Sequence, residues 1–276
     1  MKIAVSVVFY NPSPENIDNA LKLADIFDTV YLLDNSDKAL ENLSLPKNVS
    51  YIPYCENKGI AFALEDALQR AIKDEHDFLL TLDQDSKYSS EQHPAILKRL
   101  EKLDLEKDGI FALTTDHELE VNPNQKDEEF VHDAITSGNF LNLSLMKKFD
   151  IHFPVELFID YVDFEFDRRV LEKGLNIIQS HEFYILHTIG EPLRKNILGV
   201  KFTCMNHSPI RYYYRFRNAY YLKKKYPKYY KKLAHKTLVV DKMKMRLFEE
   251  NKKEKSLMIK QGIKDAKVGK LGAFKK

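Results

Sequence analysis

Short apolar runs alternate with amphipathic stretches in the first third of the chain, and this alternation constrains the fold most strongly. Residues 2–9 form a nearly unbroken, β-branched apolar run, which is typical of a strand buried on both faces. The sequence Asn-Pro-Ser-Pro then opens a helical stretch that reaches about residue 27. The same signals predict further strands at 29–33, 49–54 and 77–82 and a helix at 59–73. Strands that alternate with helices predict a mostly parallel sheet with helices on both faces.

The rest of the chain continues this pattern and then becomes helical. We expect an exposed polar loop at 114–129 and a helix that begins near Asp163 and ends at Gly174. Residues beyond Pro209 are predicted to be helical, and roughly the last twenty residues, rich in Lys and Gly, are expected to fray. The other expected elements are a strand at 110–113, a short helix at 143–149, a strand at 176–186, and a second basic helix that follows Pro227 and ends near 250.

Polar residues follow each of the first four predicted strands. In parallel α/β sheets, ligands bind outside the carboxyl ends of the strands. One polar strand end is usually a turn or a helix cap, but four in register predict a ligand site. These residues are Asn11, Asp34, Asn35, Glu56, Asn57, Asp83 and Asp85.

Asp83 and Asp85 stand two residues apart at the end of the fourth predicted strand. Alternate residues of an extended segment point the same way, so the two carboxylates can share one ligand. Carboxylate oxygens suit Mg²⁺ or Mn²⁺, and Mg²⁺ commonly combines one or two carboxylates with substrate phosphates. The pair therefore predicts a divalent metal site completed by a diphosphate.

The small net charge of +2 hides a strong asymmetry. Residues 201–276 hold 23 Lys or Arg against 5 Asp or Glu, whereas residues 1–200 hold 20 against 36. We therefore predict an acidic α/β domain over 1–200 and a basic, aromatic-rich helical extension over 201–276. An acidic domain suits a metal site, and a basic extension suits phospholipid, lipid-linked pyrophosphate or nucleic acid. A merely solvated basic helix is the other interpretation.

Several protein classes are not supported by the sequence. No apolar run approaches the roughly 18 residues that a transmembrane helix needs, and no signal-peptide cleavage pattern follows the first strand. Cys55 and Cys204 are far apart and lack ligand-type neighbours, which argues against a disulfide framework and a zinc site. We expect a cytoplasmic protein.

Seven motifs occur in the order found in one enzyme family. They are Val7-Val-Phe-Tyr-Asn11, Leu33-Asp-Asn-Ser36, Glu56-Asn-Lys-Gly-Ile-Ala61, Leu82-Asp-Gln-Asp-Ser86, Ser137-Gly-Asn-Phe140, Ile159-Asp-Tyr-Val-Asp-Phe-Glu165 and Leu186-His-Thr-Ile-Gly190. Over about residues 3–225 the chain resembles glycosyltransferase family 2, most closely its rhamnosyltransferase-like branch. The resemblance implies a Rossmann-like GT-A fold. It also implies an inverting transfer of rhamnose or a hexose from a dTDP- or UDP-linked donor to a glycan or lipid-linked acceptor in cell-surface polysaccharide synthesis, with Mg²⁺ or Mn²⁺.

The resemblance also implies roles for residues at matching positions. Asp163 would be the general base that accepts the proton of the acceptor hydroxyl. Asp83 and Asp85 would hold the metal and the donor, and His187 would add a metal or diphosphate contact. The other implied nucleotide-sugar-binding residues are Tyr10, Asn11, Asp34, Asn57, Gly59 and Gly138.

The chain departs from the family pattern beside the implied base. Val162 precedes Asp163 where family members often have Glu, and Asp160 is an additional candidate carboxylate. Arg211 is a candidate contact to the acceptor or diphosphate. Each of these residues also has an explanation that needs no ligand. The helix dipole favours carboxylates at a helix N-terminus, and a His at the end of a strand is often structural. Gly138 can simply be required by a turn.

Two other functions compete with glycosyl transfer. A sugar-phosphate nucleotidyltransferase would need a Gly-rich loop after the first strand, where Phe9-Tyr-Asn-Pro12 stands instead. A nucleic-acid-binding protein would explain the basic extension, but it leaves the acidic strand ends unexplained. We therefore expect no nucleic acid partner.

Residues 211–232 interleave Arg and Lys with Tyr, which favours peripheral attachment to the anionic inner face of the membrane.

Overall fold

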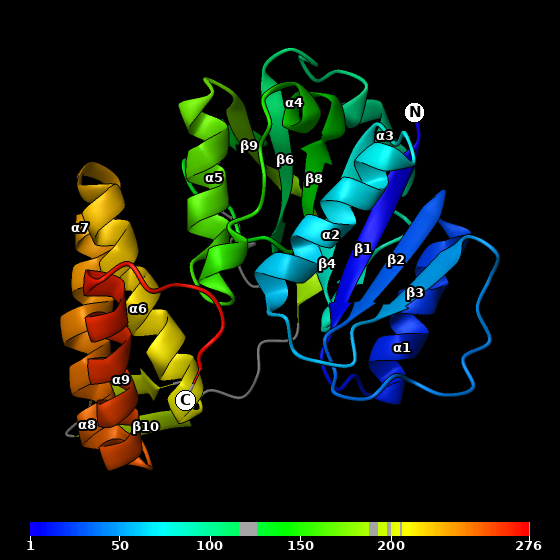
Figure 1. Cartoon of the computed structure of the whole chain (residues 1–276). Helices are drawn as coiled ribbons and strands as arrows, with labels where there is room; N and C mark the ends of the chain where they lie inside the picture. The colour runs from blue at the N-terminus through cyan, green and yellow to red at the C-terminus, as the bar shows by residue number, and fades with distance from the viewer. Residues whose placement is uncertain (116–125, 188–192, 198–199, 205, 276) are drawn as a thin grey trace. The chain divides into compact units, whose positions relative to one another are not determined.

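The computed structural model describes residues 1–115, 126–187, 193–197, 200–204 and 206–275. The chain divides into two compact units (Figure 1). Unit 1 comprises Met1–Val155 and Val162–Thr188, and unit 2 comprises Glu156–Tyr161 and Ile189–Lys276. The domain boundary at residue 200 stays a prediction; the compact units change at residue 188, and unit 2 also includes the short segment before Val162.

Unit 1 is built on one nine-stranded sheet in the order β3-β2-β1-β4-β8-β6-β9-β5, with β7 paired to β9. Six of these strands run in one direction, and β5, β7 and β8 run against them. This arrangement confirms the predicted mostly parallel α/β sheet. The strands are β1 (Ile3–Phe9), β2 (Thr29–Asp34), β3 (Val49–Pro53), β4 (Phe78–Asp83), β5 (Ser86–Tyr88), β6 (Asp108–Thr115), β7 (Glu128–Phe130), β8 (Asn139–Asn142) and β9 (Asn176–His187).

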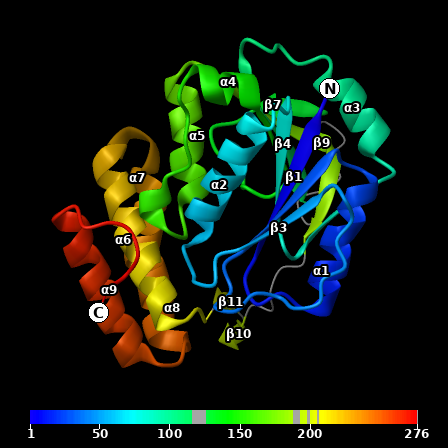
Figure 2. The same cartoon turned by 45° about the vertical axis from the view of Figure 1, so that its right-hand side comes forward.

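Helices cover both faces of the sheet. Alternate residues of β1, such as Val5 and Val7, pack in one buried cluster with Leu23 and with Leu100 of α3. On the other face, α2 contacts β1, β2 and β4, and its buried residues lie outside that cluster. Figure 2 shows α2 and α1 flanking the parallel strands. The helices of unit 1 are α1 (Pro14–Leu21), which continues as a 3-10 turn over Lys22–Asp25, α2 (Ile60–Lys73), α3 (His93–Leu100), α4 (Leu143–Lys148) and α5 (Val162–Glu172).

Local sequence explains where these helices begin and end. The Ser13 hydroxyl accepts the N–H of Asn16 at 3.2 Å, and the Asn16 side chain accepts the N–H of Ser13 at 2.9 Å. This reciprocal cap fixes the start of α1 just before Pro14. At the other end of the unit, α5 stops at Glu172, and Gly174 follows with a φ of +76°. Gly174 thus ends the helix as predicted.

The predicted exposed loop at 114–129 was wrong at both ends, although residues 126 and 127 are exposed and irregular as predicted. β6 continues through Thr115, and residues 128–130 form β7, which pairs with β9. Residues 116–125 of that prediction lie outside the described residues. Glu128 and Glu129 have low intrinsic strand preference, so pairing with a neighbouring strand decides the conformation there.

In its described residues, unit 2 consists of helices and a two-stranded antiparallel sheet. The C-terminal residues were predicted to fray, and this was wrong: α9 (Lys252–Lys267) packs along α6 (Pro209–Lys225). Ile259 is fully buried in a cluster with Phe216 and Met245, so apolar packing orders a segment that its Lys content made look solvated. The remaining elements are β10 (Leu193–Ile197), β11 (Val200–Cys204), α7 (Pro227–His235), a π-helix (Lys236–Asp241) and α8 (Lys242–Phe248), together with a 3-10 turn over Val155–Leu157 that spans the unit boundary.

Gly262 allows the close approach of α9 to α6. A Cβ atom at this position would overlap the carbonyl oxygen of Tyr213 and lie 3.3 Å from the backbone nitrogen of Arg217. Backbone atoms cannot rotate away as a flexible side chain can, so the two helices would have to separate.

We predict that Gly262→Ala lowers the free energy of unfolding of unit 2 by about 1–3 kcal/mol. Alanine gains up to about 1 kcal/mol of helix propensity over glycine, but the backbone overlap outweighs that gain. Urea unfolding followed by circular dichroism measures the change. Lys260→Ala, at an exposed position of the same helix, is the control and should have little effect. Equal stability of both variants would show that the helices do not approach so closely.

Candidate active site

Strand register brings the predicted polar residues to one edge of the sheet. β1 lies between β2 and β4, with Phe9 opposite Asp34 and Val8 opposite Asp83. The N–H of Tyr10 donates to Oε1 of Gln84 at 2.8 Å, and the N–H of Asn11 donates to Oγ of Ser36 at 2.7 Å. These bonds join the loop after β1 to the ends of β4 and β2. The structure therefore brings together the strand ends that the sequence singled out.

The Asp34 carboxylate is only 1% exposed and organises the turn after β2. One of its oxygens accepts the Ser36 N–H at 2.8 Å and the Ser36 hydroxyl at 2.5 Å, and the other accepts the Tyr51 hydroxyl at 2.7 Å. Burial, together with the hydrogen bond to Asp34, raises the pKa of Tyr51 to about 12, so Tyr51 remains a donor at neutral pH. Sequence reasoning found Asp34 but missed Ser36 and Tyr51 as its partners. The Asp-x-Ser spacing is a turn signal that could have indicated Ser36.

Tyr10 and Asn11 differ from Asp34 because their side chains reach solvent. The Tyr10 side chain is 50% exposed, so an aromatic ring stands open at the carboxyl end of β1. Asn11 has a φ of +47°, a left-handed conformation that asparagine tolerates better than most residues. The two residues can therefore present a flat ring and an amide to a ligand.

The loop before α2 is held by amide side chains. Oδ1 of Asn35 accepts the Lys58 N–H at 3.1 Å, and Oδ1 of Asn57 accepts the Gly59 N–H at 3.0 Å. Gly59 has a φ of +85° and precedes the first residue of α2, and no side chain caps this helix. The loop thus places the N-terminus of a 14-residue helix after β3, where the helix dipole favours negative charge.

Asp83 is the last residue of β4, Asp85 lies in the turn that links β4 to β5, and both are half-buried. The Asp83 N–H donates to the Ser137 hydroxyl at 3.0 Å, and that hydroxyl lies 2.8 Å from the Ser86 hydroxyl. Ser86 also pairs with His187 between β5 and β9, so the backbone of His187 lies opposite the residue that follows Asp85. The side chain of His187 lies outside the described part of the structure.

The two carboxylates suit a cation that also binds ligands from a substrate, rather than a metal site made entirely of protein side chains. Among the described residues, no group of three or more His, Cys, Asp or Glu could hold a metal ion by itself. Two carboxylates match the usual protein contribution to a Mg²⁺ site, in which substrate phosphates and water supply the remaining ligands. Asp83 and Asp85 are thus chemically suited to a cation that arrives with a phosphate ligand.

The loop before β8 links this edge to helix α5. The Gly138 N–H donates to the carbonyl of Thr81 at 2.7 Å, and the Ala134 N–H donates to the buried carboxylate of Asp167 at 2.6 Å. Gly138 has a φ of +96°, and a Cβ there would lie 3.2 Å from the Ile185 side chain, so packing already accounts for this glycine. One loop therefore contacts both the strand that ends in Asp83 and the helix that carries the predicted base.

Asp163 occupies the first turn of α5, one turn before Asp167. Its side chain is partly exposed, and its Oδ1 accepts the N–H of Phe164 at 2.9 Å. Asp167 is fully buried, and burial raises its pKa well above the usual range; the hydrogen bond from Ala134 opposes this shift, and the charges of Asp163 and Asp133 add to it. Asp167 is a residue that the sequence did not single out, because nothing local indicates that it is buried.

Asp160 and Arg211 belong to unit 2 and pair with each other. Nη2 of Arg211 lies 3.3 Å from the Asp160 carboxylate. Asp160 precedes α5 with a φ of +62°, and Phe158 and Tyr161 also have positive φ, which is uncommon for aromatic residues. The possible roles of Asp160 and Arg211 as a second carboxylate and an acceptor contact stay predictions.

Two buried side chains of α6 hold the segment 156–161. Nδ2 of Asn218 lies within 3.0 Å of the carbonyl oxygens of Leu157, Ile159 and Asp160. Arg217, also fully buried, donates to the carbonyl of Leu157 at 2.8 Å. These bonds satisfy carbonyl groups in a left-handed stretch that would otherwise be costly. An Arg-Asn pair inside an aromatic helix was the signal that sequence analysis left unused.

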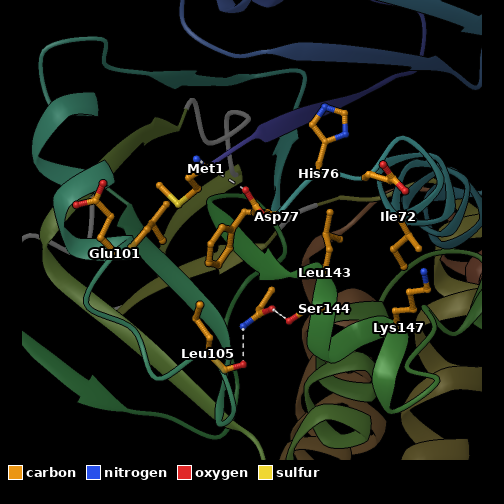
Figure 3. Close-up of a pocket in the computed structure, with 13 residues that line it drawn as sticks. Met1, Ile72, His76, Asp77, Glu101, Leu105, Leu143, Ser144 and Lys147 are labelled. Carbon is orange, nitrogen blue, oxygen red and sulfur yellow. Dashed lines mark hydrogen bonds and ion pairs between the residues drawn. The ribbon is translucent and has the colours of Figure 1, made fainter.

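A pocket of about 630 Å³ lies at the opposite edge of the sheet (Figure 3). It is lined by Met1, Asp77 at the start of β4, and Leu143 at the start of α4. None of the predicted site residues lines it. This pocket is therefore separate from the edge where the aspartates gather.

A mostly parallel sheet that ends in paired aspartates beside its first strand is the architecture of GT-A glycosyltransferases, and solved structures confirm this fold. A crystal structure of residues 1–349 of TarS from S. aureus with UDP matches with a TM-score of 0.51 and 16% identity, over 96% of this chain and 71% of that one. A crystal structure of GalNAc-T7 with UDP, GalNAc and Mn²⁺ matches with a TM-score of 0.58 and 11% identity, over 97% of this chain and 57% of that one.

In sequence, the chain is similar to the dTDP-rhamnosyl transferase RfbF of Shigella flexneri. The two are 27% identical over 238 residues, which cover 79% of each protein. No family model matches the chain. The predicted resemblance to rhamnosyltransferase-like members of glycosyltransferase family 2 is confirmed by this relative together with the GT-A fold.

The raised pKa of Asp167 generates a prediction about stability and pH. Because the folded state holds this proton more tightly than the unfolded state, its contribution to stability is present below the unfolded pKa of about 3.9 and is lost as pH rises toward the folded pKa. We predict that Asp167→Asn, which has no such proton, becomes progressively more stable than the wild type as pH rises, by at most about 1.4 kcal/mol per pH unit.

Urea unfolding over about pH 5 to 8 measures this difference. Glu172→Gln is the matched control, because Glu172 is an exposed carboxylate of the same helix. Its stability should follow the wild-type pH profile. Parallel profiles for Asp167→Asn and the wild type would contradict the burial of Asp167 as a neutral acid.

Proposed function

We infer that the protein is a glycosyltransferase that moves a sugar from a nucleotide-diphosphate donor to a hydroxyl group of an acceptor. The observation that carries this conclusion is the register of β1 between β2 and β4, which puts Asp34 and Asp83 at one edge of a GT-A sheet. The similarity to a dTDP-rhamnosyl transferase over most of both chains supports the same activity.

The donor is proposed to be a dTDP- or UDP-linked rhamnose or hexose. The exposed ring of Tyr10 can stack on a base, and Asn11 lies beside it. Asp34 supports this surface through Ser36, whose hydroxyl accepts the N–H of Asn11. The name of the RfbF relative and the UDP in the TarS structure support a pyrimidine nucleotide donor. Asn57, Gly59 and Gly138 complete the proposed donor site.

Asp83 and Asp85 are proposed to hold Mg²⁺ or Mn²⁺, with His187 as a further contact. A bound cation would stabilise the negative charge that grows on the departing nucleoside diphosphate. The Mn²⁺ in the GalNAc-T7 structure supports this assignment. Ser137 supports this proposal by linking Asp83 and Ser86, because its hydroxyl accepts the Asp83 N–H and lies 2.8 Å from the Ser86 hydroxyl.

Asp163 is proposed to be the general base. It would accept the proton of the acceptor hydroxyl as that oxygen attacks C1 of the sugar, while the bond from C1 to the diphosphate breaks and the configuration inverts. Helix N-termini favour ionised carboxylates, which is the form that a base needs. General base catalysis of this kind typically contributes about 10²–10⁴-fold.

The acceptor is proposed to be a glycan or lipid-linked glycan in cell-surface polysaccharide synthesis. The protein is proposed to act in the cytoplasm. Cys55 is an exposed free thiol, which suits a reducing compartment. In the described part of the chain, no helix is both long and apolar enough to cross a bilayer. Nucleotidyl transfer and nucleic acid binding are not favoured, because the relative is named a dTDP-rhamnosyl transferase and the two structural neighbours share the GT-A fold and were solved with UDP.

A thermal-shift panel of nucleoside diphosphates, with and without Mn²⁺, tests the proposed donor site. We predict that UDP or dTDP stabilises the wild type only with the cation, and that Asp85→Ala abolishes this stabilisation because one of two metal-binding carboxylates is lost. Asp163→Asn should keep the stabilisation and lose about 10²–10⁴-fold in transfer rate.

Glu172→Gln again serves as the control, since it alters an exposed carboxylate of α5 away from the first turn. It should bind donor and transfer sugar as the wild type does. Equal transfer by Asp163→Asn and the wild type would reject Asp163 as the base. Metal-independent binding by Asp85→Ala would reject the cation site.

A further inference from the structure

Unit 2 presents a continuous helical face that mixes cations with apolar side chains. The face runs along α7, the π-helix and α8, which follow one another from Pro227 to Phe248 without a break (Figure 1). Its residues recur every three or four positions and are exposed. We call it the basic–apolar face; it comprises Lys228, Tyr229, Lys232, His235, Lys236, Val239, Met243, Arg246 and Leu247.

The aliphatic residues of this face are only partly covered by the rest of the chain. Val239, Met243 and Leu247 are 50%, 54% and 58% exposed. The opposite side of the same helices buries Tyr230 and Met245, at 3% and 0%. A helix that already packs through one side has no internal reason to carry a second apolar stripe. The exposed stripe therefore points to a partner outside the unit.

The charges around the stripe are all of one sign. Lys228, Lys232, Lys236 and Arg246 alternate with the apolar side chains, and in the described part of the chain no salt bridge pairs them with a carboxylate. Asp241, the acidic residue within this run, is turned to Arg215 at 2.8 Å. The partner must therefore offer both negative charge and an apolar phase.

We propose that the basic–apolar face docks on the surface of an anionic lipid bilayer. Lys and Arg would contact lipid headgroups, while Val239, Met243 and Leu247 enter the headgroup boundary, as in interfacial amphipathic helices. A nucleic acid would satisfy the cations but not the apolar stripe. A second copy of the chain would bring the same cations against themselves. This inference goes beyond the proposed glycosyl transfer and does not depend on it.

Co-sedimentation of the full chain with vesicles tests the proposal. The wild type should pellet with vesicles of phosphatidylcholine and phosphatidylglycerol, and much less with phosphatidylcholine alone. Replacing Lys232 and Lys236 by Gln should weaken binding to the anionic vesicles about fivefold for each charge removed, an effect that added salt diminishes. Met243→Glu with Leu247→Glu should weaken binding at least about tenfold for each residue, at low and high salt.

Leu257→Glu is the matched control, because Leu257 is a 63% exposed leucine on α9, outside the face. It should pellet like the wild type. Circular dichroism and hydrolysis of the nucleotide-sugar donor should be unchanged in all variants, so loss of vesicle binding is distinct from unfolding and from failure of the proposed enzyme function.

Three outcomes would overturn the proposal. The first is a wild type that does not bind anionic vesicles, or face variants that bind them as well as the control does. The second is binding of single-stranded RNA that depends on the lysines and is indifferent to Met243 and Leu247. The third is a dimer in sedimentation velocity that Met243→Glu with Leu247→Glu dissociates.

Discussion

The parallel pairing of β1 with β2 and β4 is the constraint on which the candidate site depends. A parallel register fixes which residues end side by side, and here it sets Asp34 beside Phe9 and Asp83 beside Val8. A shift of one residue in either pair would turn each side chain to the other face of the sheet. Buried apolar residues on both faces of β1 hold the register, because any slip would expose part of them. The core therefore specifies the site's geometry before any ligand contributes.

Much of this arrangement follows from local sequence, and the remainder follows from contacts that local sequence does not contain. The run over residues 2–9 predicted its strand because continuous apolar, β-branched residues fit few other structures. The polar residues that follow the strands then predicted a ligand site at the carboxyl end of the sheet. Ser36 was missed although it stands two residues from Asp34. Tyr51 and Asp167 were missed for a different reason, since their roles arise from burial beside residues 17 and 33 positions away in the chain.

The C-terminal helix shows how composition can mislead. Roughly the last twenty residues were expected to fray because they are rich in Lys and Gly, yet α9 reaches Lys267 and buries Ile259, Lys255 and Asp265. The Lys255 ammonium lies 2.9 Å from Glu249, and Asp265 accepts the Tyr213 hydroxyl at 2.8 Å. Buried charges are tolerated where such partners complete their hydrogen bonds. A count of charged residues cannot distinguish a solvated lysine from a paired one.

The aspartates at the carboxyl end of the sheet also explain why the proposed function requires a cation. Asp83 and Asp85 add negative charge at the edge where a nucleoside diphosphate, itself negatively charged, is proposed to bind. The N-terminus of α2 offers roughly half a positive charge, which is too little to offset two carboxylates and a diphosphate. A divalent ion supplies two charges at contact distance and turns repulsion into attraction. An aspartate pair that seems unfavourable for phosphate binding is therefore consistent with the proposal that a metal ion binds together with the donor.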